Sequence, residues 1–174
     1  MNPEISIEVT RGDALESRHR VSLSVVDAEG RDMLARGDTL ASVFPRSAVK
    51  VLQAIPLIES GAADRFGFGD AELSLSCASH SGEEQHVRLA EAMLGRAGLA
   101  EPALECGCHW PFDQPVALAL AREGKVPNQL HNNCSGKHAG FLCTAVHLGE
   151  DWRRYVSETH AVQRRARNVM ADLT

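Results

Sequence analysis

The spacing of the apolar residues changes once along the chain, at the segment FPRSAVK, and this change restricts the possible folds. Before it, short runs at 5–12, 19–31 and 33–38 alternate apolar and polar residues and are separated by Gly and Asp. We expect an antiparallel meander of about three strands, with its tightest turn at Glu29-Gly30. After it, the spacing is helical. The sequence therefore predicts a mixed α/β (α+β) fold, in which an antiparallel sheet packs with helices.

The first helix is expected over residues 45–60. Apolar residues at helical spacing mark one face of this segment: Val49, Leu52, Ile55 and Ile58. Gly61 is expected to end the helix, and Pro56 to kink or divide it, because proline removes a backbone hydrogen bond in a helix interior.

Four further helices are expected. Ser81 is the predicted N-cap of the helix in EEQHVRLAEAMLGRAG, which Gly98 follows, and Asp113 is the predicted cap of the short helix in QPVALALAREGK. An apolar helix is predicted at 136–148, and an amphipathic one at 160–174.

The length of 174 residues suits a single domain, 1–174. Three strands form a sheet too narrow to cover the apolar faces of four or five helices. We therefore expect the chain to be the N-terminal portion of a longer domain.

Charge and hydropathy exclude several classes of partner. The net charge is −5 and the basic residues are mostly scattered, so no nucleic acid partner is expected. The N-terminus does not resemble a secretion signal, and no apolar run approaches the roughly 20 residues that a membrane span needs. We expect a cytoplasmic protein whose five cysteines are reduced.

Lysine is scarce in this chain. Of 18 basic residues only Lys50, Lys125 and Lys137 are lysines. Two of them follow a potential nucleophile or ligand by three positions, in SAVK and CSGK. Because a desolvated lysine can lose its proton and an arginine effectively cannot, these two lysines are candidates for a chemical role.

The pair Ser47 and Lys50 is the first candidate site. Residues three apart on a helix are neighbours, so the two side chains are expected to hydrogen-bond directly. A neutral lysine, favoured by the apolar helix around it, could then deprotonate the serine. The alternative is a first-turn serine beside a lysine at the helix edge, which the local sequence alone favours.

Two further polar stretches precede helices. In CASHSGE, Ser79 and His80 are either a functional hydroxyl and imidazole or a corner before the next helix. In HNNCSGKH, Cys134, Lys137 and His138 fall near one face, where sulfur and nitrogen donors could bind zinc; the alternative is a polar loop that caps a helix. Cys106, Cys108 and His109 in ECGCHWP are a weaker metal-binding pattern.

In this order and spacing, FPRSAVK, CASHSGE, CGCHWP and HNNCSGKHAGF resemble the Rhizobium etli type (class 3) L-asparaginase family, amidohydrolases related in fold to serine β-lactamases and glutaminases. The resemblance implies that Ser47 is the nucleophile, Lys50 its base and Ser79 a second catalytic hydroxyl. It also implies that Cys134 and Lys137 are ligands of a zinc ion.

The expected reaction is the hydrolysis of L-asparagine to L-aspartate and ammonia through an acyl-enzyme. Arg46, Asn133 and His138 are candidate contacts of the substrate's carboxylate or amine, and we expect a homodimer. Members of the family continue beyond the length of this chain, with a second catalytic lysine and another cysteine ligand, so we expect a truncated site here.

Two other functions remain open from the sequence. One is a β-lactamase-like or penicillin-interacting hydrolase, which also uses a serine and a lysine three residues apart. The other is a non-catalytic fragment that acts as an interaction module through exposed apolar surfaces.

Overall fold

A computed structural model describes residues 3–174 and divides the chain into two compact units, one ending at Phe44 and the other formed by Pro45–Thr174. The structure is of mixed α+β type, as predicted. Within the described residues, no helix combines the length and apolar character needed to cross a bilayer.

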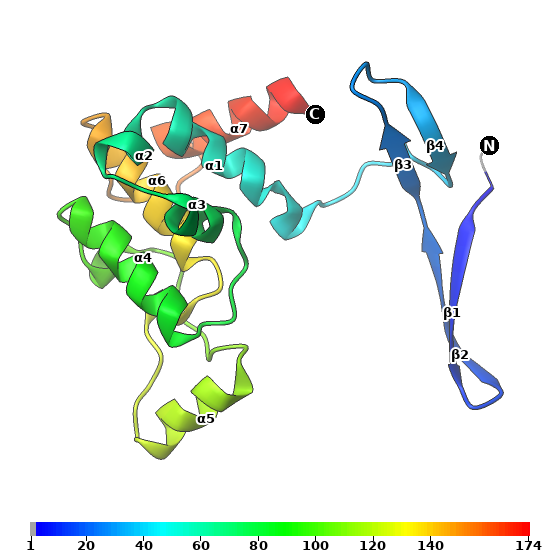
Figure 1. Ribbon diagram of the computed structural model, residues 1–174, viewed down its shortest axis with the longest axis horizontal. Helices are drawn as coiled ribbons and strands as arrows, with labels where there is room; N and C mark the ends of the chain where they lie inside the picture. Colours follow the sequence, from blue (N-terminus) through cyan, green and yellow to red (C-terminus); the bar gives the residue numbers. More distant parts are fainter. Residues whose placement is uncertain (1–2) are drawn as a thin grey trace. The chain divides into compact units, whose positions relative to one another are not determined.

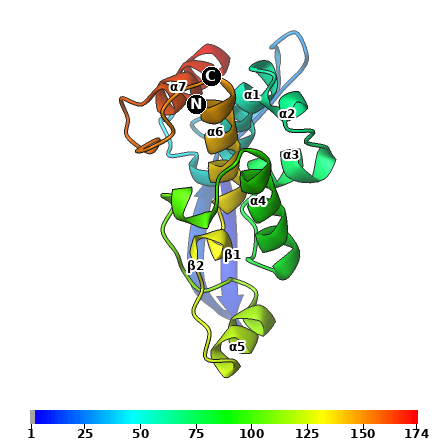
Figure 2. The ribbon, with the colours of Figure 1, turned by 90° about the vertical axis from the view of Figure 1, so that its left-hand side faces the viewer.

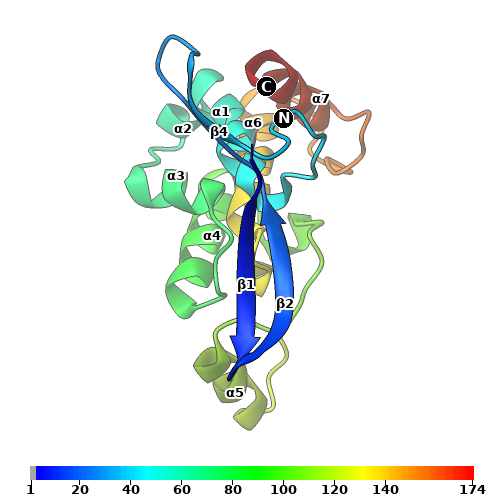
Figure 3. The ribbon, with the colours of Figure 1, turned by 90° about the vertical axis from the view of Figure 1, so that its right-hand side faces the viewer.

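The first unit consists of two separate antiparallel hairpins. Strand β1 (Ile5–Arg11) pairs with β2 (Ala14–Val21), and β3 (Leu23–Val26) pairs with β4 (Asp32–Arg36). Figure 3 shows the β1–β2 hairpin face on. The prediction of one meander of about three strands is therefore wrong.

The sequence did not reveal β2 as a separate strand because residues 16–20, which form its middle, are all polar. In place of an apolar face, Arg18 of β2 pairs with Glu8 of β1, with Nη2 and Oε1 2.6 Å apart. The turn at Glu29-Gly30 is confirmed: Gly30 has a φ of +78°, and the Asp27 carboxylate accepts the backbone N–H groups of Glu29 and Arg31. Glycine adopts this conformation without steric cost.

The second unit contains the helices. The α-helices are α1 (Lys50–Glu59), α2 (Ala62–Arg65), α3 (Asp70–Cys77), α4 (Glu84–Arg96), α5 (Gln114–Arg122), α6 (Ser135–His147) and α7 (Ala161–Leu173). Three short 3-10 helices join them: η1 (Arg46–Val49), η2 (Glu101–Ala103) and η3 (Gln129–His131).

Helix α6 is the centre of this unit. Nine of its thirteen residues are buried, and α1, α3, α4 and α7 pack against it (Figures 1 and 2). Glycine permits the closest of these approaches, because a Cβ atom at Gly136 would lie 2.5 Å from the carbonyl oxygen of Leu75 on α3. The apolar helix predicted at 136–148 is thus confirmed, and α3 lies almost in backbone contact with its first turn.

The segment 45–60 differs from its prediction in two ways. Pro56 does not divide the helix, since α1 continues from Lys50 to Glu59. The buried stripe also differs: Lys50, Ala54 and Leu57 are buried, whereas Ile58, on the predicted apolar face, is 55% exposed. A lysine therefore occupies a core position of this helix.

The predicted helix caps have mixed outcomes. Asp113 caps α5 as expected, because its carboxylate accepts the N–H of Val116 at 2.9 Å. Ser81 is not a cap: α4 begins at Glu84, and the Ser81 hydroxyl donates to the carboxylate of Glu83 at 2.7 Å. The Ser81 hydroxyl therefore bonds to the Glu83 carboxylate instead of to a backbone N–H of the first turn of α4. The final amphipathic helix is confirmed as α7.

Candidate active site

Lys50 connects three segments of the second unit. Its side chain is only 3% exposed, and its Nζ lies 2.7 Å from the carbonyl oxygen of Ala78, 2.8 Å from Oγ of Ser79 and 3.5 Å from the carbonyl oxygen of Asn133. The hydrogen bonds of Nζ thus go to Ser79 and two carbonyls. The expected direct bond to Ser47 is not made.

Ser47 lies near this lysine, in the 3-10 turn η1 that precedes α1. A hollow of about 320 Å³ opens beside it. Its lining residues come from η1, α1 and the start of α6: Arg46, Ser47, Lys50, Gln53, Cys134 and Lys137. The structure therefore brings together the nucleophile, the base and both ligands that the sequence predicted, from two distant motifs.

The backbone before Ser47 is strained. Arg46 has a φ of +49°, in the left-handed region that residues other than glycine rarely adopt. Arg154 is the other non-glycine residue with a positive φ among residues 3–174. Such strain persists where the surrounding structure holds it, and functional sites are a common location.

Asn133 contributes its backbone to the site. Its carbonyl oxygen accepts from the His80 N–H at 3.1 Å and faces Lys50, and its own N–H donates to Nε2 of His109 at 3.1 Å. The predicted substrate contact Asn133 is therefore a junction between CASHSGE, CGCHWP and HNNCSGKH. This junction could not be predicted from the sequence, because every residue type carries the same backbone groups.

His80, next to Ser79, is a buried histidine with both ring nitrogens bonded. Nδ1 accepts the N–H of Gly82 at 3.1 Å, so Nε2 carries the proton and donates to the Ser135 hydroxyl at 2.8 Å. The His80 ring also stacks on that of His86, with centroids 5.0 Å apart. Burial, together with the nearby His86 and Lys50, lowers the pKa of His80 to about 4.

This pKa predicts a loss of stability in mild acid. Between about pH 6.5 and 4 the unfolded chain protonates His80 and the folded chain does not, so the free energy of unfolding falls as the pH falls through this window, by up to about 3 kcal/mol. Urea unfolding of the wild type and His80→Gln at a series of pH values measures it. The variant should show the shallower pH dependence; identical slopes would contradict the assignment.

Cys134 and Lys137 lie one helical turn apart at the start of α6, and both are half-buried. Burial lowers the pKa of Lys137, and the Coulombic effect of the Cys134 sulfur, when it is a thiolate, opposes this shift. A thiolate and a neutral amine are suitable donors for zinc, but a closed site requires four ligands. Within residues 3–174, no three His, Cys, Asp or Glu side chains gather where they could hold a metal ion. The sulfur of Cys134 and the nitrogen of Lys137 are therefore suitable zinc ligands, but they form only part of a complete coordination sphere.

His138 follows these two residues on α6. Burial, and then the charges of Lys137 and Lys50, lower its pKa to about 3, so its imidazole is neutral at physiological pH. Its Nδ1 lies 2.6 Å from the hydroxyl of Tyr155, which is fully buried. The sequence did not identify Tyr155, because it belongs to no motif; its one signal is that it is the only tyrosine in the chain.

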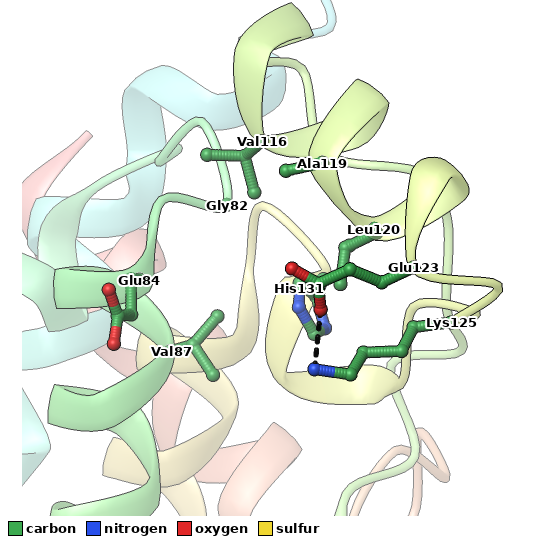
Figure 4. A pocket seen from close by; sticks show the side chains of 9 residues that line it. All are labelled: Gly82, Glu84, Val87, Val116, Ala119, Leu120, Glu123, Lys125 and His131. Atoms are coloured by element: carbon green, nitrogen blue, oxygen red, sulfur yellow. Dashed lines mark ion pairs between the residues drawn. The ribbon is translucent and has the colours of Figure 1, made fainter.

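A second hollow, of about 420 Å³, lies between α4, α5 and η3. In Figure 4 the side chain of Val87 lies on one side of it and those of Val116 and Leu120 on the other, and Lys125 pairs with Glu123 at 2.6 Å. None of its lining residues carries a hydroxyl or thiol. The larger hollow therefore lacks a hydroxyl or thiol nucleophile, and the hollow that contains Ser47 is the candidate active site.

Comparison with known proteins agrees with this geometry. A family model described as L-asparaginase II matches residues 7–174, which includes all four motifs. No match was found among curated proteins. Because the family match spans nearly the entire sequence, the chain belongs to the L-asparaginase II family.

Proposed function

We propose that this protein hydrolyses the side-chain amide of L-asparagine, with Ser47 as nucleophile and Lys50 as base. Membership of the L-asparaginase II family supports an amidohydrolase that acts on a small molecule. The observation that carries the mechanism is the buried Lys50, which contacts the Ser79 hydroxyl and lines the same hollow as Ser47.

The hydrogen bonds of Lys50 suit a base. A neutral amine has two N–H groups and one lone pair. The carbonyl oxygens of Ala78 and Asn133 can accept the two N–H groups, which leaves the lone pair for the hydroxyl of Ser79. Ser79 is then the hydroxyl through which Lys50 takes up the proton of Ser47. If Lys50 contacted the Ser47 hydroxyl directly, as expected from the sequence, no such intermediate hydroxyl would be needed.

In the proposed reaction Ser47 Oγ bonds to the side-chain amide carbon, and its proton passes to Lys50. The tetrahedral intermediate expels ammonia, which takes the proton back, and water then releases aspartate from the acyl-enzyme. Arg46 and His138 are the proposed contacts of the substrate's charged groups.

Cys134 and Lys137 would hold the zinc ion. When bound, zinc would supply a Lewis acid that orients a substrate oxygen. The lowered pKa of Lys137 favours the neutral amine that such binding needs. Two further ligands would be needed to complete the four-ligand coordination of zinc.

The test is ammonia release by the purified chain with L-asparagine, with L-glutamine in parallel. Release of ammonia and aspartate in equal amounts is expected. Circular dichroism and size exclusion establish that the chain tested is folded. A folded chain that releases no ammonia would contradict the proposal, and acylation of Ser47 by a fluorescent penicillin would redirect it to the β-lactam-binding hydrolases.

A further inference from the structure

Tyr155 lies in the irregular segment between α6 and α7, and its hydroxyl has two partners. The backbone N–H of Glu105 donates to it at 3.0 Å, and Nδ1 of His138 lies 2.6 Å away. The two aromatic rings meet edge to face, with centroids 5.5 Å apart. Tyr155 therefore joins the ECGCHWP loop to the His138 position of the third motif.

The direction of these hydrogen bonds follows from the number of protons available. A backbone N–H can only donate, so the Tyr155 oxygen accepts from Glu105. Tyr155 is fully buried, and its single O–H needs an acceptor, which Nδ1 of His138 provides. Burial also raises the pKa of Tyr155, so the phenol keeps its proton. Nδ1 is then unprotonated, and the proton of the neutral ring lies on Nε2.

Nε2 of His138 is available to a ligand. Within residues 3–174, Nε2 of His138 makes no hydrogen bond. The buried side-chain atoms without a hydrogen bond are His86 Nδ1, Glu150 Oε2 and Arg165 Nη1, so Nε2 of His138 is not a buried atom. It is therefore accessible to solvent. His138 is not itself a lining residue of the candidate active site, but it directly follows Lys137, which is one.

We infer that Tyr155 is a positioning residue, which fixes His138 in the Nε2–H tautomer so that this group donates a hydrogen bond to an acceptor oxygen of the substrate. The substrate class is a small molecule with a carboxylate, since an imidazole N–H donor suits an anionic oxygen. This assignment of the ligand rests on the proposed function. The tautomer itself does not.

The support of Tyr155 is rigid enough for this role. The carboxylate of Glu105 accepts the backbone N–H of Arg154 at 2.7 Å, while the backbone N–H of Glu105 donates to Tyr155. Gln163 on α7 donates to the carbonyl oxygen of Tyr155 at 2.9 Å. Arg154, immediately before Tyr155, has a φ of +56°. Several independent contacts thus hold the hydroxyl against the imidazole.

The direct test is long-range proton–nitrogen NMR of the histidine rings at neutral pH, with His138→Gln used to assign the His138 signals. Protonated and unprotonated ring nitrogens differ clearly in chemical shift. The wild type should show only the Nε2–H tautomer at His138, and Tyr155→Phe a mixture of both. An Nδ1–H ring in the wild type, or an unchanged tautomer in Tyr155→Phe, would overturn the inference whether or not the chain is active.

Glu105→Ala is the matched control, because it removes the carboxylate that holds Arg154 but keeps the backbone donor to Tyr155. Its His138 tautomer should equal that of the wild type, because the backbone N–H of Glu105 and the side chain of Gln163 still hold Tyr155 in place. In kinetics, Tyr155→Phe should raise KM for L-asparagine about tenfold with a smaller change in kcat. In a His138→Gln background, whose amide supplies its own donor, Tyr155→Phe should add no further increase; an equal increase in both backgrounds would overturn the coupling.

Discussion

Ser47→Ala is expected to lower the rate of ammonia release from L-asparagine by a factor on the order of 10⁴ or more, because no acyl-enzyme can form without the hydroxyl. Ser47 is exposed at the hollow, and its replacement by alanine removes no contact of the buried core, so the variant should fold normally. The rates of the two purified proteins at saturating and limiting substrate measure the effect.

Ser74→Ala is the control for this substitution. Ser74 is an exposed serine on α3, away from the residues that line the candidate active site, and its variant should keep the wild-type rate. Ser79→Ala provides the decisive comparison, because the hydroxyl of Ser79, and not that of Ser47, is hydrogen-bonded to Nζ of Lys50. If Ser79→Ala abolished the acyl-enzyme while Ser47→Ala retained it, the nucleophile would be Ser79.

Gly136→Ala is expected to destabilise the second unit by about 3 kcal/mol or more. The new Cβ would lie 2.5 Å from both the carbonyl oxygen and Cγ of Leu75, and a clash with backbone cannot be relieved by a rotamer change. Helices α3 and α6 would have to separate, which would also pull apart the Ser79 and Cys134 segments. Urea unfolding followed by circular dichroism measures the loss.

Gly95→Ala gives a matched comparison on another helix. A Cβ at Gly95 of α4 meets no atom within 4 Å, so alanine there should raise the free energy of unfolding by about 0.5 kcal/mol through its helix propensity. Equal stabilities of the two variants would show that the close approach of α3 and α6 does not limit stability.

The helical positions were largely predictable from the sequence, but the faces they bury were not. In α1, periodicity favoured a stripe that includes Ile58, whereas the buried stripe contains Lys50. Apolar patterns cannot identify a buried lysine, because its burial depends on carbonyl oxygens from Ala78 and Asn133, which are distant in sequence. The hairpin pairing was missed for a related reason: polar cross-strand contacts do not produce an apolar alternation.

In the candidate site, too, the local motifs were predictable and the contacts between distant segments were not. Ser47, Lys50, Cys134 and Lys137 were found because their motifs are local, and they do line one hollow. The contact between Lys50 and Ser79, 29 positions apart, replaced the local pair that helical spacing predicted. Tyr155 was missed because it belongs to no motif, and its contact with His138 depends on the folded structure.

Arg46 and Arg154 hold left-handed backbone conformations directly before Ser47 and Tyr155, the two residues whose hydroxyls are assigned roles in attack and in positioning. Glycine would occupy either position without strain, which costs on the order of 1 kcal/mol for other residues. Selection for thermal stability alone would therefore favour glycine at both sites. The same exchange would loosen the segments that hold these hydroxyls, so engineering for stability and for catalysis should diverge at these two arginines.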